Sequence, residues 1–507
     1  MKPSSELHQL IASLSPNEKG YFKKYCQRNG ATSGKKYITL FDAVASQKVY
    51  DEEKLKKKIG DPALAKNLPS EKNYLYHLIL ESLLVARTTD DPHYECELLL
   101  SKARWLSTRS FYDSASRFAE KAREKAIANE YFTIALDATE LELLLWQYLQ
   151  KDERRGFTVI IEERKRVRTQ MNITDELRFL DMDVIRLFQE IGIGRNEEQL
   201  AQYKAIYDKS LVLKKENPDL PVRAQIFLYN IGVFYSNVTG NAENSLQDLR
   251  LMIALTDDHP VIRKERLSFY LSSLNNIILL LLHMGNYAEA QEKINQLQTI
   301  KTETQNQENT LFITRYNTQF ELCTLTQNWD MMLKLSLKLK TELPAYELRL
   351  DNRYTGHVRF AAFRSCFYTG NYKEAQQWIN QLVQKTAGEP FKSELVTVAR
   401  ISELVLHETL GNYDLVETLL HSSKRFLNKT NALYPFEKVM IDFFAKKISD
   451  PDDKKHFENL HKNLGEVGED ILQNRVFNYF NFKDWARARE NGVLIKDLDT
   501  VARPAVK

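Results

Sequence analysis

The feature that most constrains the fold is a segment that the chain carries twice. Residues 281–297 are LLHMGNYAEAQEKINQL, and residues 366–382 are CFYTGNYKEAQQWINQL. A third GNY stands at 411–413, and QNW at 327–329 takes the corresponding place between the first two. A segment that returns at a regular interval is typical of a chain built from one structural unit, stacked so that neighbouring units bury each other's apolar faces.

The interval between these segments is 41–45 residues. With the aromatic residue of each turn as the reference, the same register extends toward the N-terminus, with weak agreement at positions 153 and 197. The eight reference positions are Tyr112, Glu153, Glu197, Ala242, Tyr287, Trp329, Tyr372 and Tyr413. They predict an all-α protein with about eight helical hairpins.

The residue types at each turn suit a helical hairpin. Gly and Asn tolerate left-handed backbone angles and end the first helix. The aromatic residue and the small residue three positions later, Ala290 or Ala375, lie on one face of the second helix. We expect the small residue to let the helices approach closely while the ring fills the crevice beside it. Loss of the ring of Tyr287 or Tyr372 is then expected to cost about 3–5 kcal/mol.

The turn pattern G-x-Y-x-x-A resembles that of the tetratricopeptide repeat, and LYNIGVFY at 228–235 resembles the first-helix pattern of that family. The interval here is longer than the family's period of about 34 residues. The resemblance implies a right-handed α–α solenoid with lengthened helices, and packing similar to HEAT repeats is the alternative. The opening residues are also similar to uncharacterised repeat proteins common in Bacteroidetes, which implies no activity.

The segments on either side of the array lack the turn. We expect an N-terminal helical domain over 1–91, the repeat array over 92–429, a C-terminal helical cap over 430–490 and a tail over 491–507. Within the first segment, Ser15, Pro16 and Glu18 predict a capped helix start. The aromatic-rich run VFNYFNFKDWARA at 476–488 predicts a cap that seals the last hairpin, and a peptide-docking patch is the alternative.

Composition excludes several classes of function. The net charge is +3, from 71 basic and 68 acidic residues, so no strong general attraction to nucleic acid or membrane is expected. The four cysteines are isolated, and the longest apolar run, IILLLL at 277–282, is too short to span a bilayer. No apolar run of signal-peptide length opens the chain. These observations favour a cytoplasmic protein.

Catalytic and cofactor motifs are absent from the sequence. Neither G-x-x-x-x-G-K-[ST] nor H-E-x-x-H occurs, and no G-x-G-x-x-G follows a strand. IGIG at 191–194 predicts a turn. Cys323 and Cys366 are expected in the core, because zinc would need two further ligands that no nearby spacing supplies. We therefore predict no catalytic site, no cofactor and no metal.

Two groups of residues are candidates for partner binding. Asn230, Asn275 and Asn317 occupy the same position of successive first helices, which tends to face the concave groove in tetratricopeptide arrays. Side-chain amides there can donate to and accept from a peptide backbone. The alternative is that each Asn bonds the neighbouring hairpin.

The second group lies in YELRLDNRYTGHVRFAAFRSCFY at 346–368, where arginines alternate with rings. Arg359 and Arg364, with Arg349 and Arg353, could bind carboxylate or phosphate groups. The alternative is that these arginines pair with neighbouring glutamates.

Together these patterns favour a non-enzymatic scaffold that binds a peptide or helix of a partner protein in the solenoid groove. One alternative is a regulator that contacts nucleic acid through residues 1–91, which carry 15 basic and 11 acidic residues. Another is a helical-repeat enzyme with a site assembled from distant residues. The sequence does not specify the partner or the oligomeric state.

Overall fold

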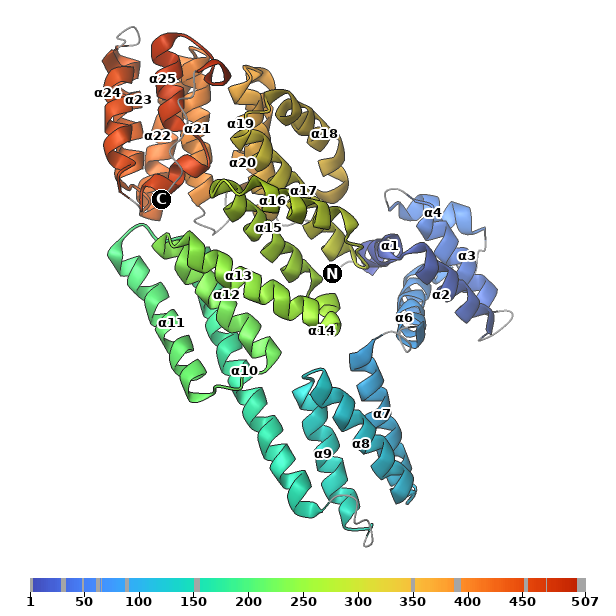
Figure 1. The fold of residues 1–507 in the computed structure, drawn as a ribbon. Coiled ribbons are helices and arrows are strands. Elements are labelled where there is room, and N and C mark those ends of the chain that lie inside the picture. Colours follow the sequence, from blue (N-terminus) through green and yellow to red (C-terminus); the bar gives the residue numbers. More distant parts are fainter. Residues whose placement is uncertain are drawn as a thin grey trace. The chain divides into compact units, whose positions relative to one another are not determined.

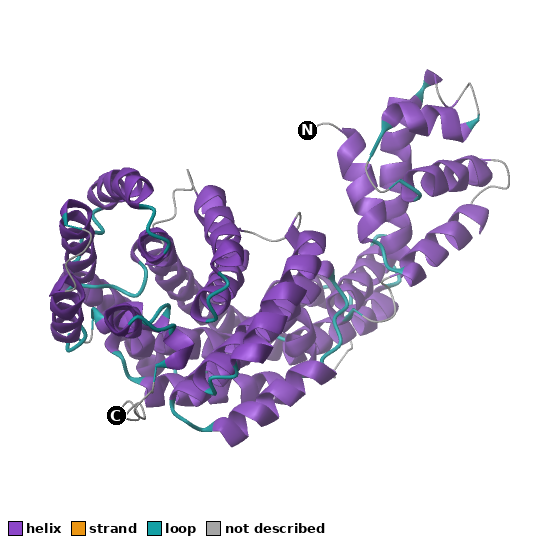
Figure 2. Cartoon of the chain, turned by 90° about the horizontal axis from the view of Figure 1, so that it is seen from above, coloured by secondary structure: helices purple, strands orange, loops and turns teal. Residues whose placement is uncertain are grey.

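The computed structural model describes residues 3–28, 33–47, 50–60, 64, 66–86, 91–149, 156–347, 352–386, 394–450, 455–470 and 472–498. Within these ranges every regular element is a helix (Figures 1 and 2). The chain divides into two compact units, Met1–Met171 and Asn172–Lys507.

The described part of the first unit begins with five helices around a core that includes Leu7, Phe22 and Phe41. The predicted helix start is confirmed, since the Ser15 hydroxyl accepts from the Glu18 amide and the Glu18 carboxylate accepts from the Ser15 amide. Three further helices then pack in succession. The elements are α1 (Pro3–Ser13), α2 (Pro16–Arg28), α3 (Ser33–Ala45), α4 (Glu52–Ile59), α6 (Leu68–Ala86), α7 (Pro92–Ser107), α8 (Tyr112–Ala128), α9 (Phe132–Trp146) and the start of α10 (Phe157–Ile191).

The second unit continues α10 and adds a series of hairpins. Its elements are α11 (Glu197–Glu216), α12 (Val222–Thr239), α13 (Ala242–Asp258), α14 (Pro260–Glu265), α15 (Leu267–His283), α16 (Tyr287–Thr299), α17 (Gln305–Leu325), α18 (Trp329–Glu347), α19 (Asn352–Tyr368), α20 (Tyr372–Thr386), α21 (Glu394–Thr409), α22 (Tyr413–Thr430), α23 (Pro435–Ser449), α24 (Lys455–Val467), η2 (Asn474–Asn478), α25 (Phe482–Asn491) and η3 (Ile495–Asp497). Each of α15, α17, α19 and α21 packs on its hairpin partner and on the first helix of the next pair.

The reference positions of the repeat are the first residues of seven helices. These helices are α8, α11, α13, α16, α18, α20 and α22, while Glu153 lies outside the described residues. The residue that ends the preceding helix has a left-handed backbone at Gly285, Gln327, Gly370 and Gly411, with φ between 53° and 80°. The GN and QN pairs therefore end their helices as the sequence predicts.

The small residue of each turn is buried where the two helices of a hairpin meet. Ala290, Met332 and Ala375 are 0% exposed, and Val416 is 1% exposed. Each of these small or apolar residues therefore lies on the buried face of its helix, as predicted.

The prediction for the ring of Tyr287 is wrong, because this side chain is 46% exposed. At the first position of a helix, a side chain that points toward the N-terminus lies over the turn rather than between the helices. Trp329 gains cover from Tyr368 at the end of α19, in the next hairpin, with 5.9 Å between ring centroids. Tyr372 gains cover from Phe367 on the preceding helix, at 5.4 Å. The described residues provide Tyr287 with no comparable ring.

The weakly marked units around 153 and 197 differ from the rest of the array. The 35 residues of α10 form one continuous helix through this region and across the division between the two units. The predicted turn at 191–194 follows it, with Gly192 and Gly194 at φ values of 68° and 71°.

Candidate functional site

Three of the predicted binding residues line one cavity in the second unit. Asn275, Asn317 and Arg364 belong to α15, α17 and α19, three successive first helices. The cavity has a volume of about 340 Å³. Its remaining lining comes from the same helices, from Leu395 of α21 and from the C-terminal segment at Asn478 and Tyr479.

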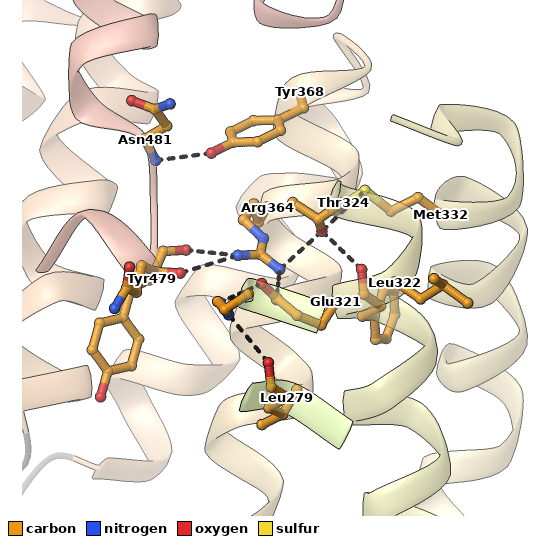
Figure 3. A network of polar contacts seen from close by, with 12 residues as sticks. Leu279, Glu321, Leu322, Thr324, Met332, Arg364, Tyr368, Tyr479 and Asn481 are labelled. Atoms are coloured by element: carbon orange, nitrogen blue, oxygen red, sulfur yellow. Dashed lines mark hydrogen bonds and ion pairs between the residues drawn. The ribbon is translucent and has the colours of Figure 1, made fainter. Parts of the chain in front are cut away.

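Arg364 holds the C-terminal segment against this cavity (Figure 3). Its Nη1 donates to the main-chain carbonyls of Asn478 and Tyr479 at 3.3 and 3.2 Å. Its Nη2 donates to Glu321 Oε2 at 2.9 Å and to Thr324 Oγ1 at 3.0 Å. One predicted groove arginine therefore already binds main chain, and that main chain is the protein's own.

Glu321 lies between two basic groups. Its Oε1 is 3.2 Å from His283 Nε2, and its Oε2 accepts from Arg364. Burial is the largest single effect on the pKa of Arg364 and lowers it, but the charge of Glu321, its hydrogen bond to Arg364 and the nearby Tyr368 together raise the pKa above its ordinary value. The positive charge of Arg364 is thus balanced inside the cavity wall and leaves no strong field for an anion.

Several polar groups of the cavity have no partner among the residues that the structure describes. Asn275 Oδ1 is a buried acceptor without a hydrogen bond, although Nδ2 of the same amide donates to Asn276 Oδ1 at 3.3 Å. The amide of Asn317 and the ring nitrogens of His357 make no hydrogen bond within the described ranges. Burial of Asn275 Oδ1 without a partner costs free energy, so a ligand that donates a hydrogen bond to this oxygen would be favoured. Asn317 is partly exposed and His357 is exposed, so their polar groups are open to water or to a ligand.

Asn230 supports the alternative interpretation of the amide row. It is 8% exposed on α12, and its Nδ2 donates to Asp181 Oδ1 of α10 at 2.6 Å. Burial raises the pKa of Asp181 to about 6, although Asn230 and Arg266 oppose the shift. This amide therefore joins two helices and does not line the cavity.

Arg359 is buried in the second unit and is not among the residues that line the cavity. It is 1% exposed, and its Nη1 donates to the hydroxyl of Thr355 one turn earlier on α19. Arg349 and the side chain of Arg353 lie outside the described residues. Of the predicted arginines with described side chains, Arg364 alone lines the cavity.

The aromatic run near the C-terminus contributes to the core rather than to a docking patch. Phe480 and Phe482 are 0% exposed, and Trp485 is 1% exposed. Phe480 packs on Phe367 and Tyr368, with 5.3 Å between each pair of ring centroids. The alternative of an exposed peptide-docking patch is therefore wrong for these three rings.

Sequence analysis missed Glu321, His357 and Tyr479 as cavity residues. Glu321 lies four residues after Asn317 on α17, which places both on one helix face. His357 lies between the predicted arginines on α19 and stacks on Tyr479, with centroids 6.2 Å apart. Helix periodicity could have identified the first two, but no local pattern brings Tyr479 to this site.

The described residues contain no group of three or more His, Cys, Asp or Glu side chains placed to hold a metal ion. Cys323 and Cys366 are buried thiols, as predicted, and burial raises the pKa of each. No helix in the described part of the chain has the length and apolar character needed to cross a bilayer. Comparison of the chain with models of protein families, with curated proteins and with solved structures found no match.

Proposed function

We propose that the protein is a non-enzymatic scaffold that binds a segment of a partner protein in the cavity lined by Asn275, Asn317 and Arg364. In this proposal the hairpins form a right-handed solenoid similar to tetratricopeptide arrays. The carrying observation is that these three residues, predicted from a common register, line one cavity, in which Asn275 Oδ1 is a buried acceptor without a partner among the described residues.

The chemistry of the cavity supports a polypeptide ligand. Amides on α15 and α17 offer both donors and acceptors, as a peptide main chain requires. Phe320, Phe360 and Leu395 supply apolar lining. Because Glu321 balances Arg364, the cavity lacks the cluster of free cations that binds a phosphate backbone.

The test is purification from the native host followed by mass spectrometry, with and without nuclease and at two salt concentrations. The chains compared are the wild type, the double variant Asn275→Ala/Asn317→Ala and the control Asn295→Ala. Asn295 is an exposed amide on α16 whose Oδ1 accepts from Gln291 at 3.0 Å. Loss of two amide contacts should reduce partner recovery about tenfold, and the control should recover the partner normally.

Equal recovery with the double variant would place binding elsewhere on the protein. Recovery that requires nucleic acid and falls steeply with salt would support the regulator instead.

A further inference from the structure

The C-terminal segment from Gln473 to Phe482 is held at its two ends by different kinds of contact. At one end, Phe480 and Phe482 are fully buried and their ring centroids lie 4.8 Å apart. Beyond them, the Trp485 indole donates to Thr409 Oγ1 at 3.1 Å. Burial of three aromatic side chains contributes several kcal/mol, so this end is firmly anchored.

The other end combines apolar contacts, Val476 in the core and the ring of Phe477 at 5.9 Å from that of Phe436, with hydrogen bonds of two arginines. Arg475 Nη1 donates to the carbonyl of Ile193 at 3.1 Å, and its Nη2 donates to the carbonyl of Val238 at 2.5 Å. Arg195 Nη2 donates to Gln473 Oε1, and Gln473 Nε2 donates back to the Arg195 carbonyl at 3.4 Å. These bonds reach the turn after α10 and the end of α12, far from this segment in the sequence.

Charged groups are buried at this polar end. Arg195 Nη1 donates to Glu437 Oε1 at 2.5 Å, and Glu437 is 0% exposed. Burial raises the pKa of Glu437 and lowers the pKa of Arg475. The ion pair itself joins Arg195 to Glu437 and does not include the segment. The segment is attached to this polar region by the hydrogen bonds of Gln473 and Arg475, which contribute less net free energy than the burial of three aromatic rings.

Between the two ends lie Asn478 and Tyr479, which form one wall of the cavity. Their carbonyls accept from Arg364, and the Asn481 amide donates to the Tyr368 hydroxyl at 2.9 Å. The segment that forms this wall is attached more strongly at Phe480 than at Arg475. It can therefore move as a unit about Phe480 when the bonds of Arg475 break.

We propose that Gln473–Tyr479 is a strap that closes the cavity, hinged at Phe480 and released at Arg475 to admit the partner segment. This inference rests on the proposed function of the cavity. When the strap lifts, Arg364 Nη1 loses its two main-chain acceptors. The partner segment then supplies two successive main-chain carbonyls that accept from Arg364 Nη1 in place of those of Asn478 and Tyr479. The site therefore accepts a segment whose main-chain carbonyls are not already bonded within a helix or sheet.

The experiment is hydrogen–deuterium exchange of the full chain, followed by mass spectrometry of peptides that cover 473–479 and 484–491. Arg475→Gln removes the charged donor to Ile193 and Val238. Arg487→Gln on α25 is the matched control, because Arg487 is exposed and its side chain makes no hydrogen bond, ion pair or ring contact with the described residues. We expect Arg475→Gln to speed exchange of 473–479 at least tenfold and to change 484–491 less than twofold, while the control changes neither.

Equal acceleration of both peptides, or no change in either, overturns the strap, because the segment would then be one cooperative cap. If Arg475→Gln does not fold, Arg475→Lys, which keeps one donor, is judged by the same comparison. The exchange measurement needs no partner. If the partner binds the Asn275→Ala/Asn317→Ala variant as well as it binds the wild type, the proposed function is refuted, and this result is independent of the exchange result for the strap.

Discussion

The hairpin α12–α13 and the later first helices α15 and α17 use the same register position in opposite ways. On α12, Asn230 is buried against Asp181 of α10 and serves the fold. On α15 and α17, Asn275 and Asn317 line a cavity, and the residues that the structure describes give no hydrogen bond to Asn275 Oδ1 or to the Asn317 amide. The difference follows from what covers each helix. A repeat register fixes where a side chain points, and the neighbouring element decides whether it is structural or available to a ligand.

The largest expected effect is the pH dependence of the free energy of unfolding that comes from Asp181, the buried carboxylate that binds Asn230. The folded pKa of Asp181 is about 6 and its ordinary value is 3.8, so the folded state binds more protons between these values. Stability from this group is therefore present below pH 4 and lost as pH rises toward 6. Two pKa units correspond to about 3 kcal/mol. Urea unfolding of wild type and Asp181→Asn should diverge by about this amount across the window, and parallel curves would contradict it.

The next effect separates the two kinds of asparagine directly. Asn230→Ala removes the only side-chain donor that the described residues give to the buried Asp181, and should lower the free energy of unfolding by about 2 kcal/mol. Asn275→Ala and Asn317→Ala should each change it by less than about 0.5 kcal/mol. Chemical denaturation measures all three. Equal losses would mean that the amides of the cavity are structural as well.

A smaller effect concerns the close approach of α12 and α13. A Cβ on Gly232 would lie 2.2 Å from the Asp248 carboxylate, so Gly232→Ala must displace that group. We expect a loss of about 1–2 kcal/mol, typical of overpacking. Gly465→Ala on α24 is the control, because no atom lies within 4 Å of the added carbon. Its thermal midpoint should rise slightly, since alanine favours a helix more than glycine.

The smallest expected effect concerns the exposed ring of Tyr287. Tyr287→Ala should lower the free energy of unfolding by less than about 1 kcal/mol, in contrast to a buried aromatic. Tyr372→Ala should cost more, because Tyr372 packs against the main core of the second unit. If calorimetry shows similar losses of stability for Tyr287→Ala and Tyr372→Ala, then the contact of Tyr372 with the ring of Phe367 does not determine how much the aromatic residue of the turn contributes.

The sequence predicts local features of this chain well. Glycine and asparagine at the turns, and small residues such as Ala290 and Ala375, specify where each helix begins and which face it buries. These properties depend on neighbours three or four residues away, which a linear pattern contains.

The part of the site that sequence analysis could not supply depends on long-range contacts. Tyr479 reaches the cavity because Arg364 binds its carbonyl across more than one hundred residues of chain. Arg195 binds Glu437 and Gln473 because the fold places the turn after α10 beside these two residues. Neither relation has a period or a motif, so only the folded chain reveals it.

The continuity of α10 also links the two compact units energetically. Nucleating a helix is costly, whereas extending one is not, so each half of α10 is formed more readily because the other half exists. Val167 lies buried on one side of the division at Met171, and Leu177 lies buried on the other. Cutting the polypeptide there would create two frayed ends and two half-helices with incomplete apolar stripes. The stability of each half of α10 therefore depends on the residues that continue the helix beyond Met171.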